Sequence, residues 1–132
     1  MPLPIRHILL ADDDQDDILL FETAAQEACP DLELTVADNG LQLISLLDEI
    51  NTPDAIFLDL NMPFKSGKEC LKEIRSKHQF DNVPVIILST SNHKSDIDYC
   101  LSKGANHYFT KPNSYKGLKE IVVDLCDGKL TA

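Results

Sequence analysis

Several polar side chains stand where short apolar runs of the sequence end: Asp12, Asp13, Asp59, Ser89 and Lys111. Carboxylates packed close together repel one another, so a cation should accompany them. Carboxylates suit a hard divalent ion, and Mg²⁺ in particular keeps waters for a phosphate oxygen. A carboxylate can also be the nucleophile that receives a phosphoryl group, provided that the metal and a lysine neutralise the transferring oxygens. These residue types predict Mg²⁺-dependent phosphoryl transfer to an aspartate.

Asp59 is the acid that the neighbouring sequence presents most clearly. Residues 55–58 form an apolar run too short for a typical helix, and Met62–Pro63 prevents its extension, which indicates a strand buried on both faces. A lone aspartate at a strand end is usually a turn or capping residue. Asp59 becomes a candidate nucleophile because the other polar groups are expected to converge on it.

Strand and helix patterns alternate along the whole chain. The expected strands are residues 8–11, 32–37, 55–58, 83–88 and 107–110, and each is followed by apolar residues at helical spacing. The first of these helices ends before Cys29–Pro30, and the fourth carries Ile97, Leu101 and Cys100 and stops at Gly104. Five such units predict an α/β fold, a five-stranded parallel sheet with helices on both faces, flavodoxin-like and three-layered.

The carboxyl ends of parallel strands share one edge of the sheet, and ligands bind there in open α/β folds. Asp12, Asp13, Asp59, Ser89 and Lys111 should therefore meet despite their separation in sequence. Other acids at the start of the first helix, namely Asp14, Asp16 and Asp17, are explained by the helix dipole and are left outside the predicted site.

Composition limits the classes of function that the chain could have. The 132 residues fit a single domain, 1–132, and leave no room for an output domain. Twelve basic against 22 acidic residues give a formal charge of −10, which disfavours binding to nucleic acid or to an anionic membrane. No signal peptide and no long apolar stretch is present in the sequence, so a cytoplasmic location is expected.

Cysteine and histidine residues lack the spacing of a metal site. Cys29, Cys70, Cys100 and Cys126 lie far apart with no Cys-x-x-Cys pair. Small buried thiols in a reducing compartment are therefore expected, in preference to disulfides or zinc ligands. The four histidines are expected to be surface or structural residues.

The polar residues and their order along the chain resemble the receiver domain of two-component response regulators, the family whose simplest member is the chemotaxis regulator. The resemblance covers nearly the whole chain and rests on four motifs: L-L-A-D-D, L-D-L-N-M-P, V-I-I-L-S and Lys111–Pro112. It implies that Asp59 is the phosphoacceptor. It also implies that Asp13, Asp59 and the backbone carbonyl of Asn61 hold Mg²⁺, with Asp12 acting through water.

The same resemblance assigns the remaining roles and the partners. Ser89 and Lys111 should bind the phosphoryl oxygens, and Tyr108 should be the aromatic switch residue. The donor is expected to be a sensor histidine kinase or a phosphotransfer protein. The signal should leave through protein contact on the face formed by the helix with Ile97, the strand 107–110 and the last helix. Small stand-alone bacterial regulators, including those that serve phytochromes, are the most similar members.

Three other functions compete with this interpretation. A nucleotide or flavin binder needs bare N–H groups after its first strand, where Asp12 and Asp13 would instead repel a phosphate. A phosphatase that uses an aspartyl phosphate needs a general acid two residues after the nucleophile, where Asn61 stands. An adaptor independent of phosphorylation would lack an essential group, and none is missing. We therefore expect a signalling protein and not an enzyme, one that catalyses only its own phosphoryl transfer and slow autodephosphorylation.

Overall fold

The computed structural model describes residues 5–130, so residues 1–4 and 131–132 of the predicted domain lie outside it. The strands are β1 (His7–Ala11), β2 (Glu33–Ala37), β3 (Ala55–Leu58), β4 (Val85–Ser89) and β5 (His107–Thr110). The helices are α1 (Gln15–Ala28), α2 (Gly40–Glu49), α3 (Gly67–Arg75), α4 (Lys94–Ser102) and α5 (Tyr115–Cys126), with the short 3₁₀ helix η1 at His78–Phe80. Apart from η1, each element lies where the sequence predicts it to within two residues at either end.

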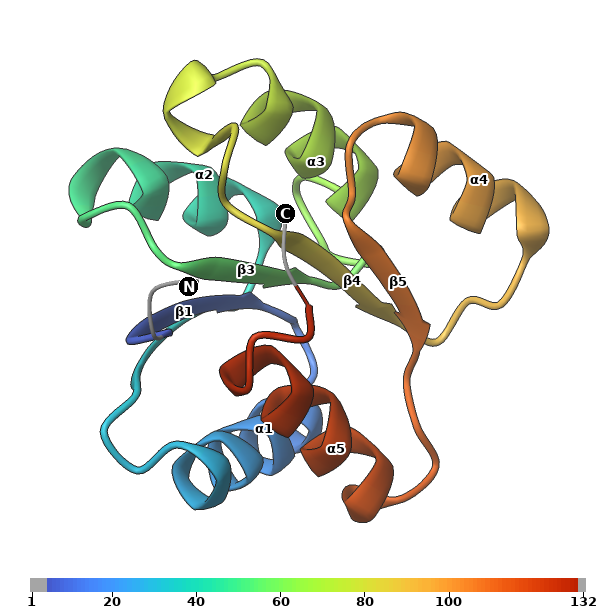
Figure 1. The fold of residues 1–132 in the computed structure, drawn as a ribbon. Helices are drawn as coiled ribbons and strands as arrows, with labels where there is room; N and C mark the ends of the chain where they lie inside the picture. Colours follow the sequence, from blue (N-terminus) through green and yellow to red (C-terminus); the bar gives the residue numbers. More distant parts are fainter. Residues whose placement is uncertain (1–4, 131–132) are drawn as a thin grey trace.

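All neighbouring strands are parallel, in the order β2-β1-β3-β4-β5. Figure 1 shows α1 and α5 on one face of the sheet and α2, α3 and α4 on the other. Successive residues of β1 serve the two faces, since Leu9 packs with the α2 and α3 side chains while Ile8 and Leu10 pack with those of α1 and α5. The predicted three-layer α/β fold is confirmed.

The loop between α3 and β4 is held by one half-buried arginine. Arg75 donates hydrogen bonds to the carbonyl oxygens of Phe80 at 2.6 Å, Val83 at 2.8 Å and Gly104 at 2.8 Å. Phe80, within η1, is fully buried. This anchoring sets the start of β4 at Val85, two residues later than the sequence predicts.

Helix α4 is anchored to the core less firmly than the other helices. Every residue of α4 is described, and Cys100 is the one that is buried. Leu101, predicted from the helical spacing to share the inner face, is 47% exposed, and that prediction is wrong. Helix α5, by contrast, buries four apolar side chains along one stripe: Leu118, Ile121, Val122 and Leu125.

The start of α3 lies directly against the backbone that carries Asp59. Gly67 donates its backbone N–H to the carbonyl oxygen of Leu60 at 2.9 Å. A Cβ atom at Gly67 would stand 2.1 Å from the carbonyl oxygen of Asp59 and 2.6 Å from the Cα of Leu60. Ser66 and Glu69 form a capping box that fixes the same helix end. Glycine at position 67 therefore allows α3 to approach the loop after β3.

Gly67→Ala is expected to lower the free energy of unfolding by about 1 to 3 kcal/mol, because the added methyl group forces the Asp59 backbone or α3 to shift. Urea denaturation of parent and variant measures the difference. An unchanged urea midpoint would show that the loop after β3 accommodates the added methyl group, and would contradict the expected clash.

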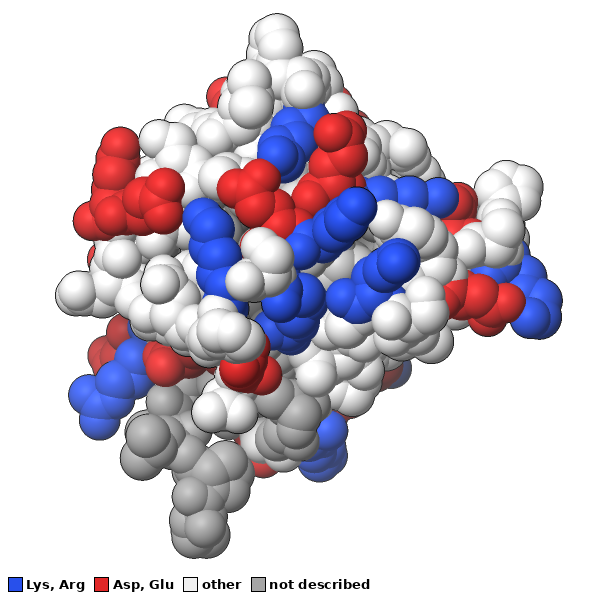
Figure 2. Space-filling view, turned by 90° about the horizontal axis from the view of Figure 1, so that it is seen from above, with Lys and Arg blue, Asp and Glu red and all other residues white. Residues whose placement is uncertain are grey.

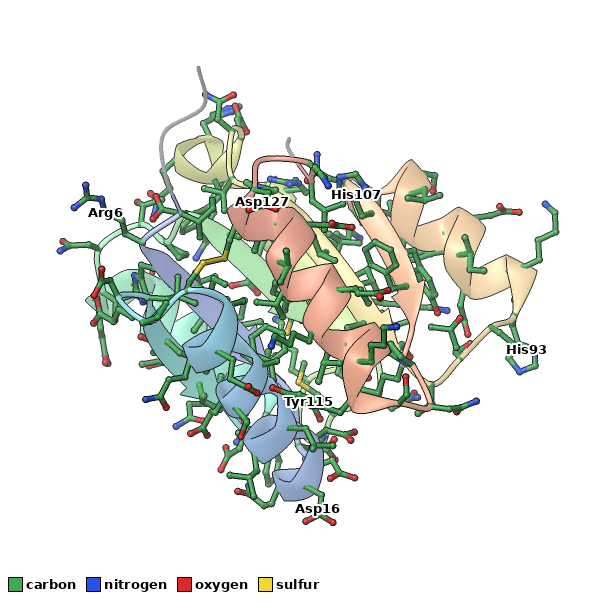
Figure 3. All side chains as sticks on the ribbon, turned by 60° about the horizontal axis from the view of Figure 1, so that its bottom comes forward. Arg6, Asp16, His93, His107, Tyr115 and Asp127 are labelled. Atoms are coloured by element: carbon green, nitrogen blue, oxygen red, sulfur yellow. A yellow bond between two sulfur atoms is a disulfide. The ribbon has the colours of Figure 1, made fainter. Side chains whose placement is uncertain are left out.

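Two of the four cysteines are paired, which the sequence analysis did not predict. Cys29 and Cys126 form a disulfide that joins the ends of α1 and α5, drawn as a yellow bond in Figure 3. Cys70 and Cys100 are free and buried, as predicted. The expectation that all four are thiols is wrong for the first pair because the two residues, 97 positions apart, meet only through the packing of α1 on α5.

Charges of both signs are interspersed over α2, α3 and α4. Figure 2 shows this face, where basic side chains gather near the centre with acidic ones beside them. Lys65 pairs with Glu73 at 2.5 Å, and Lys68 pairs with Asp96 at 2.6 Å. The predicted absence of nucleic-acid binding stays a prediction. Among the described residues, none of the helices combines the length and the apolar character needed to cross a membrane.

Candidate functional site

Three carboxylates meet at the carboxyl edge of the sheet, as predicted. Asp12 and Asp13 follow β1, Asp59 follows β3, and these strands are neighbours with Ala11 opposite Leu58. One oxygen of each acid lies within 4.8 Å of an oxygen of the other two. Asp12 and Asp59 are 3% and 5% exposed, whereas Asp13 faces solvent. The cluster is therefore a buried pair of acids with a third at its mouth.

Lys111 is the cation that accompanies the cluster. Its Nζ lies 3.0 Å from Asp12 Oδ2 and 3.4 Å from Asp59 Oδ2, and its side chain is 14% exposed. The backbone N–H of Lys111 donates to the carbonyl oxygen of Ser89 at 2.7 Å, which extends the pairing of β5 with β4 beyond the strands. This bond places the lysine over the ends of β3 and β1.

Burial and charge together shift the pKa values of the site. Burial raises the pKa of Asp59 to about 6, with Lys111 opposing the rise and Asp12 adding to it. Burial also raises the pKa of Asp12, against a backbone hydrogen bond from Asp14 and the contact with Lys111. Burial alone would lower the pKa of Lys111, but hydrogen bonds to Asp17 and Asp12 outweigh it and raise this pKa. Lys111 stays charged, and its attraction offsets only part of the cost of two buried carboxylates.

The donor set fits a divalent cation. The cluster consists of carboxylate oxygens, which hard ions such as Mg²⁺ and Mn²⁺ prefer over nitrogen or sulfur ligands. Asp13 lies on the exposed side of the cluster, where waters and a phosphate oxygen could complete the coordination shell of the cation. Asn61, the fourth predicted ligand, lies in the loop two residues beyond Asp59 and donates its backbone N–H to Asp59 Oδ1 at 3.4 Å.

Ser89 and Tyr108 are connected through the loop that follows β4. Ser89 ends β4 fully buried, and its Oγ accepts a hydrogen bond from the backbone N–H of Ser91 at 3.2 Å. The Tyr108 hydroxyl, from β5, donates to the carbonyl oxygen of Ser91 at 2.7 Å. Ser91 also donates its own hydroxyl to Asp96 in the first turn of α4, at 2.5 Å. One loop residue thus contacts the predicted phosphoryl-reading serine, the predicted switch tyrosine and α4.

One charged residue of the site was missed from the sequence. Asp17 Oδ2 lies 2.7 Å from Lys111 Nζ, closer than either Asp12 or Asp59. The prediction that Asp17 is only a helix-start charge is therefore wrong. Asp14 does have that role, since its side chain accepts the backbone N–H groups of Asp16 and Asp17 and caps α1. Asp16 is exposed, as predicted.

The sequence is similar to those of known response regulators. Residues 8–123 match the sequence profile described as "Response regulator receiver domain". Response regulator Rcp1 of Synechocystis sp. is 31% identical over 125 residues, covering 90% of this chain and 85% of that protein. A chemotaxis protein CheY homolog of Campylobacter jejuni is 29% identical over 89 residues, covering 67% of this chain and 68% of that protein.

Solved structures agree with the sequence matches. The phosphorylated cyanobacterial phytochrome response regulator RcpA superimposes with a TM-score of 0.85 at 31% identity, covering 92% of this chain and 91% of that one. The Mn²⁺-bound form of Rcp1 superimposes with a TM-score of 0.84 at 30% identity, covering 95% and 94%. These two proteins are similar to this chain in both fold and sequence, and one of them is a metal-bound form.

Proposed function

The chain belongs to the family of response regulator receiver domains, and from this premise we propose that Asp59 accepts a phosphoryl group in an Mg²⁺-dependent reaction. The observation that carries the proposal is the buried pair Asp12 and Asp59 with Lys111 between them, beside the more exposed Asp13. Burying a carboxylate next to further carboxylates and one lysine lowers the stability of the folded protein, and such an arrangement is typical of a functional site. Receiver domains bind a divalent cation at this acidic pocket.

The nucleophile is an ionised oxygen of Asp59. With a pKa of about 6, most of this carboxyl is ionised at neutral pH. A bond forms between the Asp59 oxygen and phosphorus as the bond from phosphorus to the imidazole nitrogen of a donor phosphohistidine breaks, and the leaving imidazole takes up a proton. Lys111 and the hydroxyl of Ser89 bind oxygens of the transferred group.

Asp12, Asp13, Asp59 and Asn61 would hold the cation, which when bound supplies positive charge against the oxygens of the transferring group. Asn61 also bears on the hydrolysis of the aspartyl phosphate. An amide cannot act as a general acid or base toward an attacking water, so the aspartyl phosphate should be hydrolysed slowly. This supports a signalling protein in preference to a phosphatase.

In this proposal, phosphorylation of Asp59 changes the output surface through the hydrogen bonds of Ser91. A phosphoryl group on Asp59 draws the Ser89 hydroxyl toward itself, which weakens the bond from Ser91 N–H to Ser89 Oγ. Ser91 is bonded to both Tyr108 and Asp96, so its displacement acts on β5 and α4 together. The surface formed by α4, β5 and α5 is the proposed contact for a downstream protein.

The proposed donor is a sensor histidine kinase or a phosphotransfer protein, in the cytoplasm, with neither nucleic acid nor membrane as a partner. RcpA is a phytochrome response regulator by name, so the kinase of a phytochrome is the first donor to test. The net charge of −10 is the reason to expect protein partners.

Acetyl phosphate with Mg²⁺ is expected to add the mass of one phosphoryl group to the protein, measured on the intact chain. Peptide mapping should place the group on Asp59, which follows β3 beside Lys111 at the position that receiver domains use for the phosphoacceptor. The reaction should stop when a chelator removes the metal. Modification on Asp12 or Asp13, or equal modification with the chelator present, would contradict the proposal.

A further inference from the structure

Lys111 has more acceptors around its ammonium group than the reaction requires. An ammonium group has three N–H donors. The structure directs them at three carboxylates: Asp17 at 2.7 Å, Asp12 at 3.0 Å and Asp59 at 3.4 Å. The shortest contact is to Asp17, on α1, and the longest is to the proposed phosphoacceptor. The lysine therefore contacts Asp17 more closely than it contacts Asp59.

Asp17 differs from the other two acceptors in its place relative to the cation. Asp12 and Asp59 belong to the cluster that fits a divalent ion, and charge bound there would weaken their hold on Lys111. Asp17 lies outside that cluster, in the first turn of α1, with its side chain 37% exposed. Its attraction for Lys111 therefore remains when the cluster is occupied.

Space is available for the lysine to move. Asp17 and Lys111 line a cavity of about 120 Å³ between the starts of α1 and α5, bounded by Leu20, Phe21 and Leu118. The cavity leaves free space on the Asp17 side of the ammonium group. Lys111 is already in contact with both Asp17 and Asp59, so a small movement of its ammonium group favours one partner over the other.

We propose that Asp17 is a positioning residue that competes with the phosphoryl group for Lys111 and thereby limits the stability of the phosphorylated protein. The inference rests on the proposed function, in which Lys111 binds a phosphoryl oxygen. Asp17 does not touch the reacting atoms. Its role is to hold the lysine in the unphosphorylated protein, so that phosphorylation must break this ion pair.

Asp17→Asn is expected to bind a phosphoryl analogue about two- to fivefold more tightly than the parent, the range expected for losing a partly exposed ion pair. The probe is trifluoroberyllate in the presence of Mg²⁺, which adds to a carboxylate as a phosphoryl group does. Calorimetric titration of the whole protein gives the dissociation constant. An equilibrium measurement avoids the separate effects of phosphorylation and hydrolysis rates.

Asp16→Asn is the matched control. Asp16 lies in the same first turn, carries the same charge and makes no ion pair with any described residue. Figure 3 shows its side chain pointing outward from the start of α1. This variant should bind the analogue as the parent does. Equal tightening by both variants would mean that general charge removal is responsible, and would overturn the inference.

A second pair of proteins tests whether Asp17 acts through Lys111. In a Lys111→Met background, which keeps the apolar stem, Asp17→Asn should have no further effect on analogue binding. A gain of the same size in that background would show direct repulsion between Asp17 and the anion, and would overturn the inference. A parent protein that fails to bind the analogue at all would overturn the proposed function itself, and this inference with it.

Discussion

Asparagine in place of Asp59 is expected to abolish phosphorylation by acetyl phosphate and, at pH 7 without metal, to raise the free energy of unfolding by about 2 to 3 kcal/mol. Burial raises the pKa of Asp59 from 3.8 to about 6, so ionising it costs the folded protein about two pKa units, or about 3 kcal/mol. The asparagine side chain is uncharged at every pH and has the shape of the protonated acid. The phosphoacceptor would thus be a destabilising residue that reactivity requires.

The dependence on pH has a definite sign. Because the folded-state pKa of Asp59 lies above its unfolded value, the folded protein holds this proton more tightly. The parent should lose stability as the pH rises from about 4 through about 6, and the loss should level off above that range. Below pH 3.8, where Asp59 is protonated in both the folded and the unfolded protein, this loss of stability is absent.

Urea denaturation of both proteins in metal-free buffer, between pH 4 and pH 8, measures the difference between them. The curves should converge at the acidic end, separate between about pH 4 and pH 6, and stay apart by a nearly constant amount above that range. Asp16→Asn, which removes an exposed charge, should follow the parent throughout. A variant at Asp59 that is less stable than the parent at pH 7 would mean that the contact with Lys111 outweighs burial.

Mg²⁺ at about a hundred times its dissociation constant is expected to raise the free energy of unfolding of the parent by about 2.7 kcal/mol, because the ion binds the folded cluster and not the unfolded chain. Asp13→Asn should lose most of this gain. If the affinity falls about a hundredfold, the same Mg²⁺ concentration adds only about 0.4 kcal/mol. Asp13 is exposed, so its replacement leaves the buried packing intact.

Thermal melts of parent, Asp13→Asn and Asp16→Asn, each with and without Mg²⁺, measure this effect. Asp16→Asn should keep the full gain, because Asp16 is outside the carboxylate cluster. An equal gain in Asp13→Asn would place the ion elsewhere and would remove Asp13 from the metal site.

The sequence predicted the fold well because each element carries an independent local signal. The run 55–58 reads as a buried strand from its length and flanking residues, and β3 has those same bounds. Helix α4 shows the limit of such signals. Its helical spacing predicts an inner face that includes Leu101, but only the final packing decides how much of that face meets the sheet.

The candidate site was predictable to the extent that its residues follow strands. Asp12, Asp13, Asp59, Ser89 and Lys111 could be placed together from the topology of a parallel sheet alone. Asp17 could not be, because it belongs to a helix and the helix dipole already accounts for an acid there. Its contact with Lys111 depends on the path of the chain after β5, which no local pattern reports.

The light anchoring of α4 has an energetic consequence. The free energy of opening a helix locally depends on the apolar surface that opening exposes, and α4 would expose one fully buried side chain where α5 would expose four. Local opening should therefore be least costly in the helix that begins just after Ser91. A small change at the end of β4 should therefore shift the balance between docked and undocked α4 more readily than it would for a helix with a larger buried face.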